Sequence, residues 1–554
     1  MENIQNKDFP SIELPSGQPP EEYVSRIRQP YANPTPGHLP LIGVGDTTTV
    51  ANDGTIDHSP FFEESLLKIF DECGLNCIQF SMDDGSTSLR KSIENCGATG
   101  VRETVRMWGF NLSRVPVPRP PYTESSIIYQ QELDRLYKTE KEVAQEFQNR
   151  WTRAIPEVWK FKAANSYQLF DEPNQRYFKW AARTKDLILQ TDKWDTLIFD
   201  NLLPIYASPQ SLSGRGDGKL ASGPDADLGR QMTYQDYLNE YLRIFNPAVW
   251  CFDCYCLEGT GKMDEPVKLR NRYFENLDLI RRQSNSSDAP FWSTVRCLFG
   301  PMKGRDDEGN PIAAYMPESE YSKLYQTNSE LGLTASKHLP TLIASMKLES
   351  FCALAFGAKG LMFWSTINRP SGLYLWAPLF YDLTATAKNQ IKFQMETGGA
   401  DKYDKVREIC SDKISYDYSL LHKSKLFSTL QWIVTEVKKR EEYFLGAHVC
   451  DTWSTKNLPG TNSFSTQQTW IKLETSNFNG LITRLVNPKL GLEVMVVVNV
   501  DIKKSFDVAF TYTESSVKEV SGRDCGLLTI AGVTKYESTM ESGDWRIFVK
   551  PTKF

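Results

Sequence analysis

The chain has 554 residues, more than one hydrophobic core usually supports, so we expect at least two domains. Its 40% hydrophobic and 24% charged residues are those of an ordinary globular protein. A net charge of −6 argues against a nucleic-acid-binding surface, and the sequence has no run of about 18 apolar residues that would span a membrane.

Short apolar runs alternate with helical patterns along most of the chain. Residues 1–37 are rich in proline and polar residues and predict an extended lead-in. Strands are predicted, in chain order, at 39–46, 76–82, 111–115, 167–170, 196–203, 249–255, 290–298 and 361–365. The helical patterns between them are at 61–73, 87–94, 125–159, 174–190, 234–244, 271–282 and 339–357.

Eight such strands, with helical patterns rather than hairpins between them, indicate parallel pairing. The fold class we predict is α/β, a (β/α)₈ TIM barrel over residues 38–424, with the polar loops 207–230 and 300–338 walling a cleft. A doubly wound sheet is the alternative, but no Gly-x-Gly-x-x-Gly follows the first strand. A C-terminal antiparallel β-sandwich domain, residues 425–554, is predicted from strands at 428–437, 480–486, 492–500, 505–512 and 545–549.

The fourth predicted strand ends in Asp171-Glu172-Pro173. Pro173 suits the first position of a helix, which Asp171 would then cap, although Asp171 could equally orient a substrate hydroxyl. Glu172 would stand at the carboxyl end of the strand, the edge at which α/β barrels carry their chemistry. The alternative is that the three residues only begin a helix.

A barrel with a small β-sandwich and an acidic pair before proline after strand four resembles retaining glycoside hydrolases of clan A. Their acid/base glutamate lies there in an Asn-Glu-Pro motif, which implies that Glu172 is the general acid or acid/base. The wider pattern resembles carbohydrate-utilisation glycosidases of gut Bacteroidetes related to barrel β-galactosidases, which implies a glycan substrate and a periplasmic or secreted location. The segments that carry this resemblance are 167–173, 201–204, 253–255, 291–292, 356–364 and 543–548.

The chain departs from that clan at strand seven, where the nucleophilic glutamate is missing. Glu349 falls within a helical pattern, so we do not expect it to replace that glutamate. We favour Asp253 as the second carboxylate, because an acid inside an apolar strand is costly unless it is hydrogen-bonded or used. Asp84 is the second choice, with a helix cap as its structural alternative, and Asp46 is the third.

Further side chains are candidates for substrate binding. Asn201 ends strand five and could donate to a sugar hydroxyl or stabilise a turn. Tyr255, Trp292 and Trp364 could form a sugar-stacking floor, with core packing as the alternative for the tryptophans. Arg296, within an apolar strand, indicates a buried ion pair that is either structural or made with a bound anion such as a uronic acid.

No cofactor or metal is expected. The 11 cysteines fall mostly in apolar strands, and no paired Cys/His spacing indicates zinc. The first residues lack the features of a signal peptide, and nothing indicates an oligomeric state. We therefore expect a glycoside hydrolase that acts on a plant or host glycan. The alternatives are a carbohydrate-binding protein that has lost hydrolysis, and a barrel enzyme of another class.

Overall fold

The computed structural model describes residues 37–46, 49–50, 56–57, 72–81, 102–106, 164–192, 197–220, 229–258, 268–270, 272–297, 334–368, 382–383, 393, 397, 421–422, 425–465, 469–512, 514–522, 526–530 and 532–552. Residues 1–36 of the expected lead-in, the amphipathic segment 125–159 and the loop from 300 to 333 lie outside these ranges. The predictions made for those segments therefore stay predictions.

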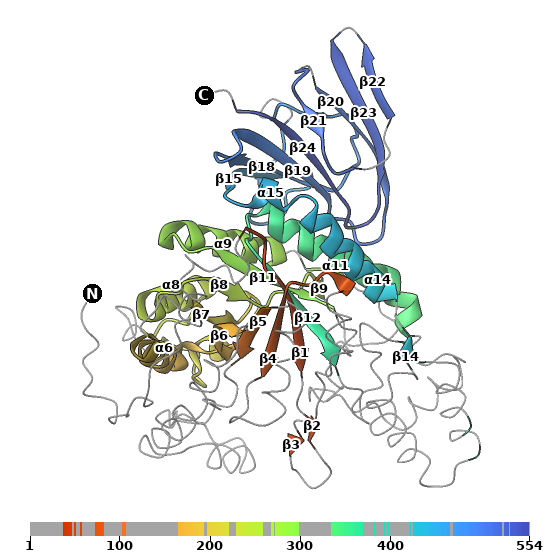
Figure 1. The fold of residues 1–554 in the computed structure, drawn as a ribbon. Coiled ribbons are helices and arrows are strands. Elements are labelled where there is room, and N and C mark those ends of the chain that lie inside the picture. The colour runs from red at the N-terminus through yellow and green to blue at the C-terminus, as the bar shows by residue number, and fades with distance from the viewer. Residues whose placement is uncertain are drawn as a thin grey trace, which may run out of the picture.

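Eight parallel strands close into a barrel in chain order (Figure 1), as the sequence predicts. The last strand pairs with the first, with Leu41 opposite Leu361. The strands are β1 (Leu41–Asp46), β4 (Cys77–Ser81), β5 (Arg102–Arg106), β6 (Ala164–Asp171), β7 (Leu197–Leu202), β8 (Trp250–Phe252), β11 (Phe291–Arg296) and β12 (Leu361–Asn368).

The third barrel strand was predicted at the wrong place. The expected segment 111–115 lies outside the described residues, and β5, which pairs with both β4 and β6, is formed by 102–106 instead. Its sequence places arginines at both ends and a glutamate between them. It therefore lacks the continuous apolar run by which buried parallel strands are recognised.

Side chains from alternate strand positions fill the barrel interior. Phe199 and Trp292 meet edge to face, with their ring centroids 5.1 Å apart. Ile42, Val44, Cys77, Leu197, Val249, Cys251 and Met362 complete this inner apolar cluster. Gln79 and Gln168 are buried and hydrogen-bonded to each other. The interior is thus a packed core, and a substrate can be bound only at an end of the barrel.

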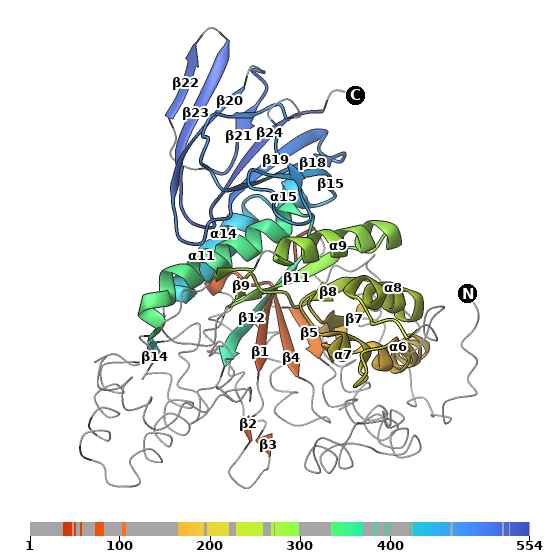
Figure 2. The same ribbon diagram turned by 180° about the vertical axis from the view of Figure 1, so that it is seen from behind.

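In the described part of the barrel, helices lie on the outside between the successive strands from β6 to β12 (Figures 1 and 2). The main ones are α6 (Phe178–Asp192), α8 (Tyr234–Phe245), α9 (Arg272–Ser287) and α11 (Thr334–Ala355). The minor two-stranded pairs are β2 (Thr49–Val50) with β3 (Ile56–Asp57), β9 (Leu257–Glu258) with β10 (Lys268–Leu269), and β13 (Asp382–Leu383) with β14 (Leu421–His422). None of the described helices is both long and apolar enough to cross a membrane.

Two local helix starts differ from the expectation. Asp171 does not cap the helix after Pro173, because the 3₁₀-helix η3 (Gln175–Tyr177) begins later and Asn174 accepts the N–H of Arg176. The expected loop 207–230 contains the short helix α7 (Pro209–Ser213), which Ser208 caps. In both places the polar residue directly before the helix is its N-cap.

Residues 428–437, predicted as a strand, belong to the helix α14 (Lys425–Lys438). Its β-branched residues favour a strand, but the buried positions are three and four residues apart, which is the helical period. These positions are Leu430, Ile433, Val434 and Val437. The short helix α15 (Glu441–Phe444) follows α14 and leads into the C-terminal domain.

The C-terminal region is an antiparallel β-sandwich, as predicted. One sheet has the order β16 (Asn462–Ser463), β15 (His448–Ser454), β18 (Gly480–Asn487), β19 (Leu492–Asn499), β24 (Trp545–Pro551), β21 (Lys518–Glu519). The other has the order β17 (Lys472–Leu473), β20 (Phe506–Tyr512), β23 (Val533–Met540), β22 (Gly526–Ile530). Between them, Phe548 meets Phe510 and Tyr536 edge to face, with centroids 5.2 and 5.3 Å apart.

The sandwich packs on α11 and α15 through a stack of three aromatic rings. Trp545 lies between Phe351 of α11 and Phe444 of α15, with centroids 4.1 and 5.6 Å away and nearly parallel ring planes. The turn before Trp545 approaches α11 so closely that a Cβ at Gly543, where φ is +73°, would lie 2.2 Å from the carbonyl oxygen of Ala344. Only glycine fits this position.

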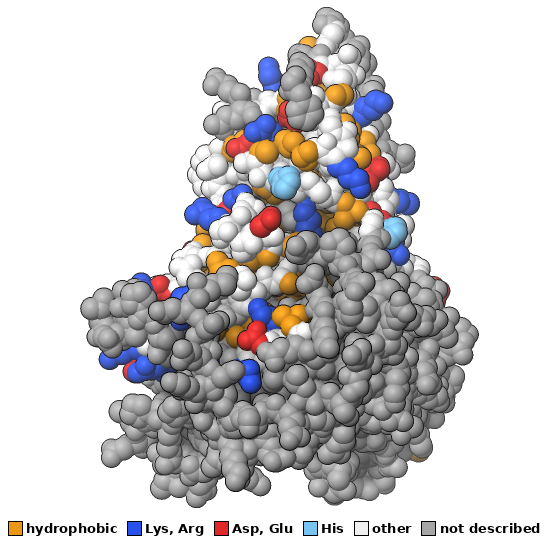
Figure 3. All heavy atoms as spheres, turned by 60° about the vertical axis from the view of Figure 1, so that its left-hand side comes forward, with side chains coloured by type: hydrophobic (Ala, Val, Ile, Leu, Met, Phe, Trp, Pro, Cys, Tyr) orange, Lys and Arg blue, Asp and Glu red, His pale blue; other side chains and the backbone are white. Residues whose placement is uncertain are grey.

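The sandwich is joined to the amino-terminal end of the barrel. Glu441 accepts the backbone N–H of Leu39, just before β1, over 2.9 Å. Lys359, just before β12, donates to the carbonyl oxygens of Phe444 and Ala447, each over 2.6 Å. The strand arrows of β1, β4 and β12 accordingly point away from the sandwich (Figures 1 and 2). On the sandwich face seen in Figure 3, acidic and basic side chains are intermingled.

Candidate active site at the barrel mouth

Asp253 stands at the carboxyl end of β8, at the mouth of the barrel. The expected strand 249–255 is shorter than predicted, since β8 ends at Phe252. The backbone N–H of Asp253 still donates to Leu202 over 3.0 Å, which fixes it beside the end of β7. Asp253 and Tyr255 therefore lie in the connection that follows the strand, where barrel enzymes place functional side chains.

The Asp253 carboxyl is enclosed by protein and incompletely hydrogen-bonded. Its Oδ1 atom is buried and has no hydrogen-bond partner. Burial raises the pKa of Asp253 to about 7, and the negative charge of Asp171 adds to the rise. The polar side chains of Asn201, Thr294 and Tyr255 act on this pKa in the opposite direction. The site thus contains a carboxyl that exchanges a proton near neutral pH.

Asn201 connects strands four, five, six and seven of the barrel at this level. Its Nδ2 donates to Asp171 Oδ1 over 3.0 Å, and its Oδ1 accepts from Cys251 and Thr294, each over 3.4 Å. Asn201 is 5% exposed, whereas the Asp171 side chain is open to solvent. The amide therefore holds Asp171 beside Asp253 at the mouth.

Glu172 occupies the next position in the chain but a different environment. Its φ of +49° is unusual for a residue other than glycine, and its N–H donates to Asn201 O over 2.6 Å. The side chain is exposed, and its charge is among those that raise the pKa of Tyr237 in α8. Of the two adjacent acids, Asp171 is the one whose charge acts on Asp253.

Glu349 has a structural position behind the mouth. It is fully buried in α11, and its two carboxylate oxygens accept the backbone N–H groups of Cys256 (2.6 Å) and Arg296 (2.7 Å). Burial raises its pKa to about 7. Glu349 thus ties the connection after β8 to the end of β11, and as expected it does not occupy the site of the missing strand-seven acid.

An aromatic and cationic group borders Asp253. Tyr255 stacks on Trp364, in the middle of β12, with centroids 5.9 Å apart and an interplanar angle of 25°. The Arg296 guanidinium lies 5.5 Å from the centroid of the Tyr255 ring. Trp364, Tyr255 and Arg296 are each partly exposed, so they are accessible from the mouth. Three of the expected binding residues therefore lie together.

One other expected residue, Trp292, does not join this group. Trp292 is fully buried in the barrel interior, where a Cβ at Gly360 would lie only 2.6 Å from its ring, so its position fits the core-packing alternative. Asp84 lies outside the described residues, and so does the side chain of Asp46. Their predicted roles stay predictions.

Sequence reasoning missed three contributors. Thr294 faces Asn201 from β11, and Tyr206, after β7, stacks with Arg270, whose guanidinium lies 3.5 Å from its ring centroid. The charge of Asp253 raises the pKa of Tyr206, although burial is the larger cause. Thr294 lies two residues before Arg296 and therefore points to the same face of the strand. This spacing is the sequence signal that would have predicted Thr294, and we find no comparable signal for Tyr206 or Arg270.

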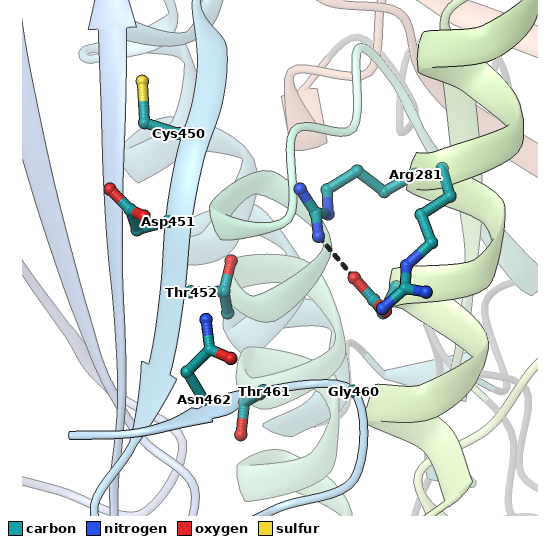
Figure 4. Close-up of a pocket in the computed structure, with 9 residues that line it drawn as sticks. Arg281, Cys450, Asp451, Thr452, Gly460, Thr461 and Asn462 are labelled. Carbon is teal, nitrogen blue, oxygen red and sulfur yellow. Dashed lines mark hydrogen bonds and ion pairs between the residues drawn. The ribbon is translucent and has the colours of Figure 1, made fainter.

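A cavity of about 250 Å³ lies elsewhere, between α9 and the β15–β16 edge of the sandwich (Figure 4). Asp278 pairs there with both Arg281 and Arg282, the latter over 2.7 Å. Asp451 pairs with Arg484 over 2.6 Å. The charges around this cavity compensate one another, and it is remote from Asp253, so the barrel mouth is the candidate active site. Among the described residues no cluster of three potential metal ligands is present.

Comparisons with known proteins give weak structural similarities only. No protein-family model matches the sequence, and no curated protein matches it. Solved structures similar to this chain include an alpha-amylase from H. orenii, with 8% identity, coverage of 93% of this chain and 99% of that one, and a TM-score of 0.42. An alpha-L-arabinofuranosidase from Thermotoga maritima has 8% identity, coverage of 94% and 98%, and a TM-score of 0.36.

An endo-alpha-mannosidase from Bacteroides thetaiotaomicron is also similar, with 9% identity, coverage of 72% of this chain and 97% of that one, and a TM-score of 0.33. The solved structures that resemble this chain thus include several glycoside hydrolases. Because fold alone does not determine activity, the case for function has to come from the site.

Proposed function

We propose that this protein hydrolyses a glycosidic bond, with Asp253 as the general acid and Asp171 as the second carboxylate. The observation that carries the proposal is the Asp253 carboxyl. It is enclosed at the carboxyl end of the barrel, its Oδ1 has no hydrogen-bond partner, and Asn201 links its neighbourhood to an exposed second acid. Glycosidases use such a pair, one acid protonated and the other ionised.

The two acids have environments that suit different roles. A pKa of about 7 keeps a substantial part of Asp253 protonated near neutral pH, so it can donate a proton to the leaving-group oxygen. Asp171 is open to solvent and accepts a hydrogen bond from Asn201, so its carboxyl is accessible and oriented for the role of nucleophile or base.

Glu172 is the alternative partner, since the resemblance assigns the acid/base role to this position. It also lies at the mouth and is exposed. The geometry favours Asp171 for two reasons. Asn201 donates a hydrogen bond to Asp171, and the negative charge of Asp171 raises the pKa of Asp253. Comparing Asp171→Asn with Glu172→Gln separates the two assignments.

The experiment uses a panel of 4-nitrophenyl and 2,4-dinitrophenyl glycosides of both anomers. We expect Asp253→Asn to lose roughly 10²–10⁴-fold in kcat on the nitrophenyl substrate that the wild type cleaves. The dinitrophenolate leaves without protonation, so the same variant should keep most of its activity on that substrate. Asp171→Asn should lose activity on both. Full activity in Asp171→Asn and Asp253→Asn would refute the assignment.

A carbohydrate-binding protein without hydrolysis is the second candidate. The observation that favours it is β11, which ends in Arg296 where the clan has its nucleophilic glutamate. Calorimetric binding of oligosaccharides without any turnover of the glycoside panel would select this candidate. A rate that disappears in Asp253→Asn would exclude it.

We also propose, from the sequence resemblance alone, that the substrate is a plant or host glycan and that the protein acts in the periplasm or outside the cell. Fractionation of the source cells, followed by detection with an antibody, tests the location. Recovery with cytoplasmic markers only would refute it.

A further inference from the structure

Arg296 ends β11 and lies on the same inward face as Thr294. Its side chain is partly exposed at the mouth, with the guanidinium against the ring of Tyr255. The Nε atom is buried and has no hydrogen-bond partner. No ion pair of this guanidinium is found among the described residues. Within the part of the chain that the structure describes, the buried Nε donor of this cation thus has no acceptor.

An arginine in this position requires compensation. Removing charged donors from water costs free energy unless acceptors replace the lost hydration. The sequence allowed two explanations, a structural ion pair or a bound anion. Glu349, the acid of α11, uses both carboxylate oxygens on the backbone N–H groups of Cys256 and Arg296, so it meets the guanidinium through charge alone and does not bind its fork.

The place of Arg296 relative to the other groups points to a substrate. Tyr255 contacts the Arg296 guanidinium, stacks on Trp364 and acts on Asp253. An aromatic pair of this kind suits the apolar face of a sugar ring, and Arg296 at its edge would reach a substituent of that ring. The negative charge of Asp171, and that of Asp253 whenever it is ionised, would repel an anionic sugar unless a cation offset it.

We propose that Arg296 binds the carboxylate of an acidic sugar, so that the substrate is a glycoside of a uronic acid. A planar guanidinium can form two parallel hydrogen bonds with a carboxylate, which gives orientation as well as affinity. This inference rests on the proposed glycosidase function. It makes Arg296 the residue that discriminates between uronic acids and the corresponding neutral sugars.

The test compares 4-nitrophenyl glucuronides and galacturonides with the matching glucosides and galactosides, in both anomers. We expect the wild type to cleave one uronide with a kcat/KM at least roughly tenfold above that of its neutral counterpart. Arg296→Gln should lose that preference, mainly through a higher KM for the uronide, with a much smaller effect on the neutral substrate. Arg296→Lys should keep part of it, because the charge remains without the bidentate geometry. Arg282→Gln, on the surface of α9, is the matched control and should behave as the wild type.

The outcomes separate this inference from the proposed function. Cleavage of neutral glycosides with no preference for a uronide, or an equal loss on both in Arg296→Gln, overturns the role of Arg296 and leaves the glycosidase intact. If no glycoside is cleaved, the proposed function fails. Calorimetry with free glucuronic and galacturonic acid then shows whether Arg296 binds an acidic sugar. Binding by the wild type that is weakened at least tenfold in Arg296→Gln supports the inference, and no binding overturns it. Thermal unfolding of each variant shows whether it is folded.

Discussion

Asn201 donates a hydrogen bond to the carboxylate of Asp171 over 3.0 Å, and this single contact orients the more exposed of the two interacting acids. The same amide accepts from Cys251 and Thr294 through its oxygen, so its orientation is held from two further strands. One buried side chain thus helps to position Asp171 at the mouth.

We predict that Asn201→Ala lowers kcat more than it raises KM. Loss of a hydrogen bond to a charged group costs about 1.5–3 kcal/mol, which corresponds to a reduction of roughly 10- to 100-fold. Since the Asn201 side chain lowers the pKa of Asp253, its removal should also move the alkaline limb of the pH–rate profile to higher pH. Asn239→Ala, on the exposed face of α8, is the control, and an unchanged profile in Asn201→Ala would contradict the prediction.

The wild-type rate should fall as the pH rises through about 7, because the pKa of Asp253 is raised to that value and the acid must be protonated to act. In Asp171→Asn the charge that helps to raise this pKa is gone, so the transition should move to lower pH. The shift can be followed by the residual kcat/KM or by carboxyl NMR. A transition that stays in place would show that Asp171 does not act on Asp253.

We expect Glu349→Gln to destabilise the protein and impair the site together. A glutamine offers one acceptor oxygen to two backbone N–H groups, which leaves one of them unsatisfied at a cost of about 1–3 kcal/mol. Urea unfolding measures the loss, and kcat/KM should fall because Cys256 and Arg296 are no longer tied together. Glu275→Gln, on the outer surface of α9, is the control. Normal activity at full stability would contradict a positioning role.

Asp200 provides a pH-dependent stability test away from the proposed chemistry. It is fully buried, accepts from Phe170 N–H and Tyr241 O–H over 3.0 Å each, and burial raises its pKa to about 7. A carboxyl whose folded-state pKa is raised stabilises the protein fully below its unfolded pKa, and that contribution is lost as the pH rises through 7. The unfolding free energy of the wild type should thus decline between pH 4 and 7 relative to Asp200→Asn. Equal slopes in urea titrations would refute this, with Asp288→Asn as the surface control.

Trp545→Ala should uncouple the two domains. Removing a large buried aromatic side chain costs about 3–5 kcal/mol, and here the lost contacts are the stacked rings of Phe351 and Phe444. We expect two unfolding transitions in calorimetry where the wild type shows one. Val533→Ala, at a 40% exposed position of the sandwich, should leave a single transition. A single transition in Trp545→Ala would show that this stack does not couple the domains.

The barrel, the sandwich and the position of Asp253 at the mouth followed from local patterns, because buried parallel strands and half-buried antiparallel strands differ in periodicity. The different surroundings of Asp171 and Glu172 did not. Strict alternation from inward-facing Gln168 would turn position 172 inward, but an irregularity between Gln168 and Asp171 shifts the pairing with β7 and brings Asp171 opposite Asn201. A one-residue shift in strand register of this kind cannot be recognised from the amino-acid composition of the strand.

Contacts between residues far apart in the chain also could not be predicted from the sequence. That Glu349 accepts N–H groups from two distant connections depends on how α11 lies against the barrel, and no spacing in the sequence encodes it. The same holds for α14, where β-branched residues favoured a strand and packing selected a helix.

The attachment of the sandwich through Glu441 and Lys359 has a practical consequence for handling the protein. These contacts fix the sandwich at the amino-terminal ends of the barrel strands. A solid support or a fusion partner joined to the sandwich would stand behind the barrel, so that an immobilised molecule would present Asp171, Asp253 and Arg296 toward bulky or insoluble polymers.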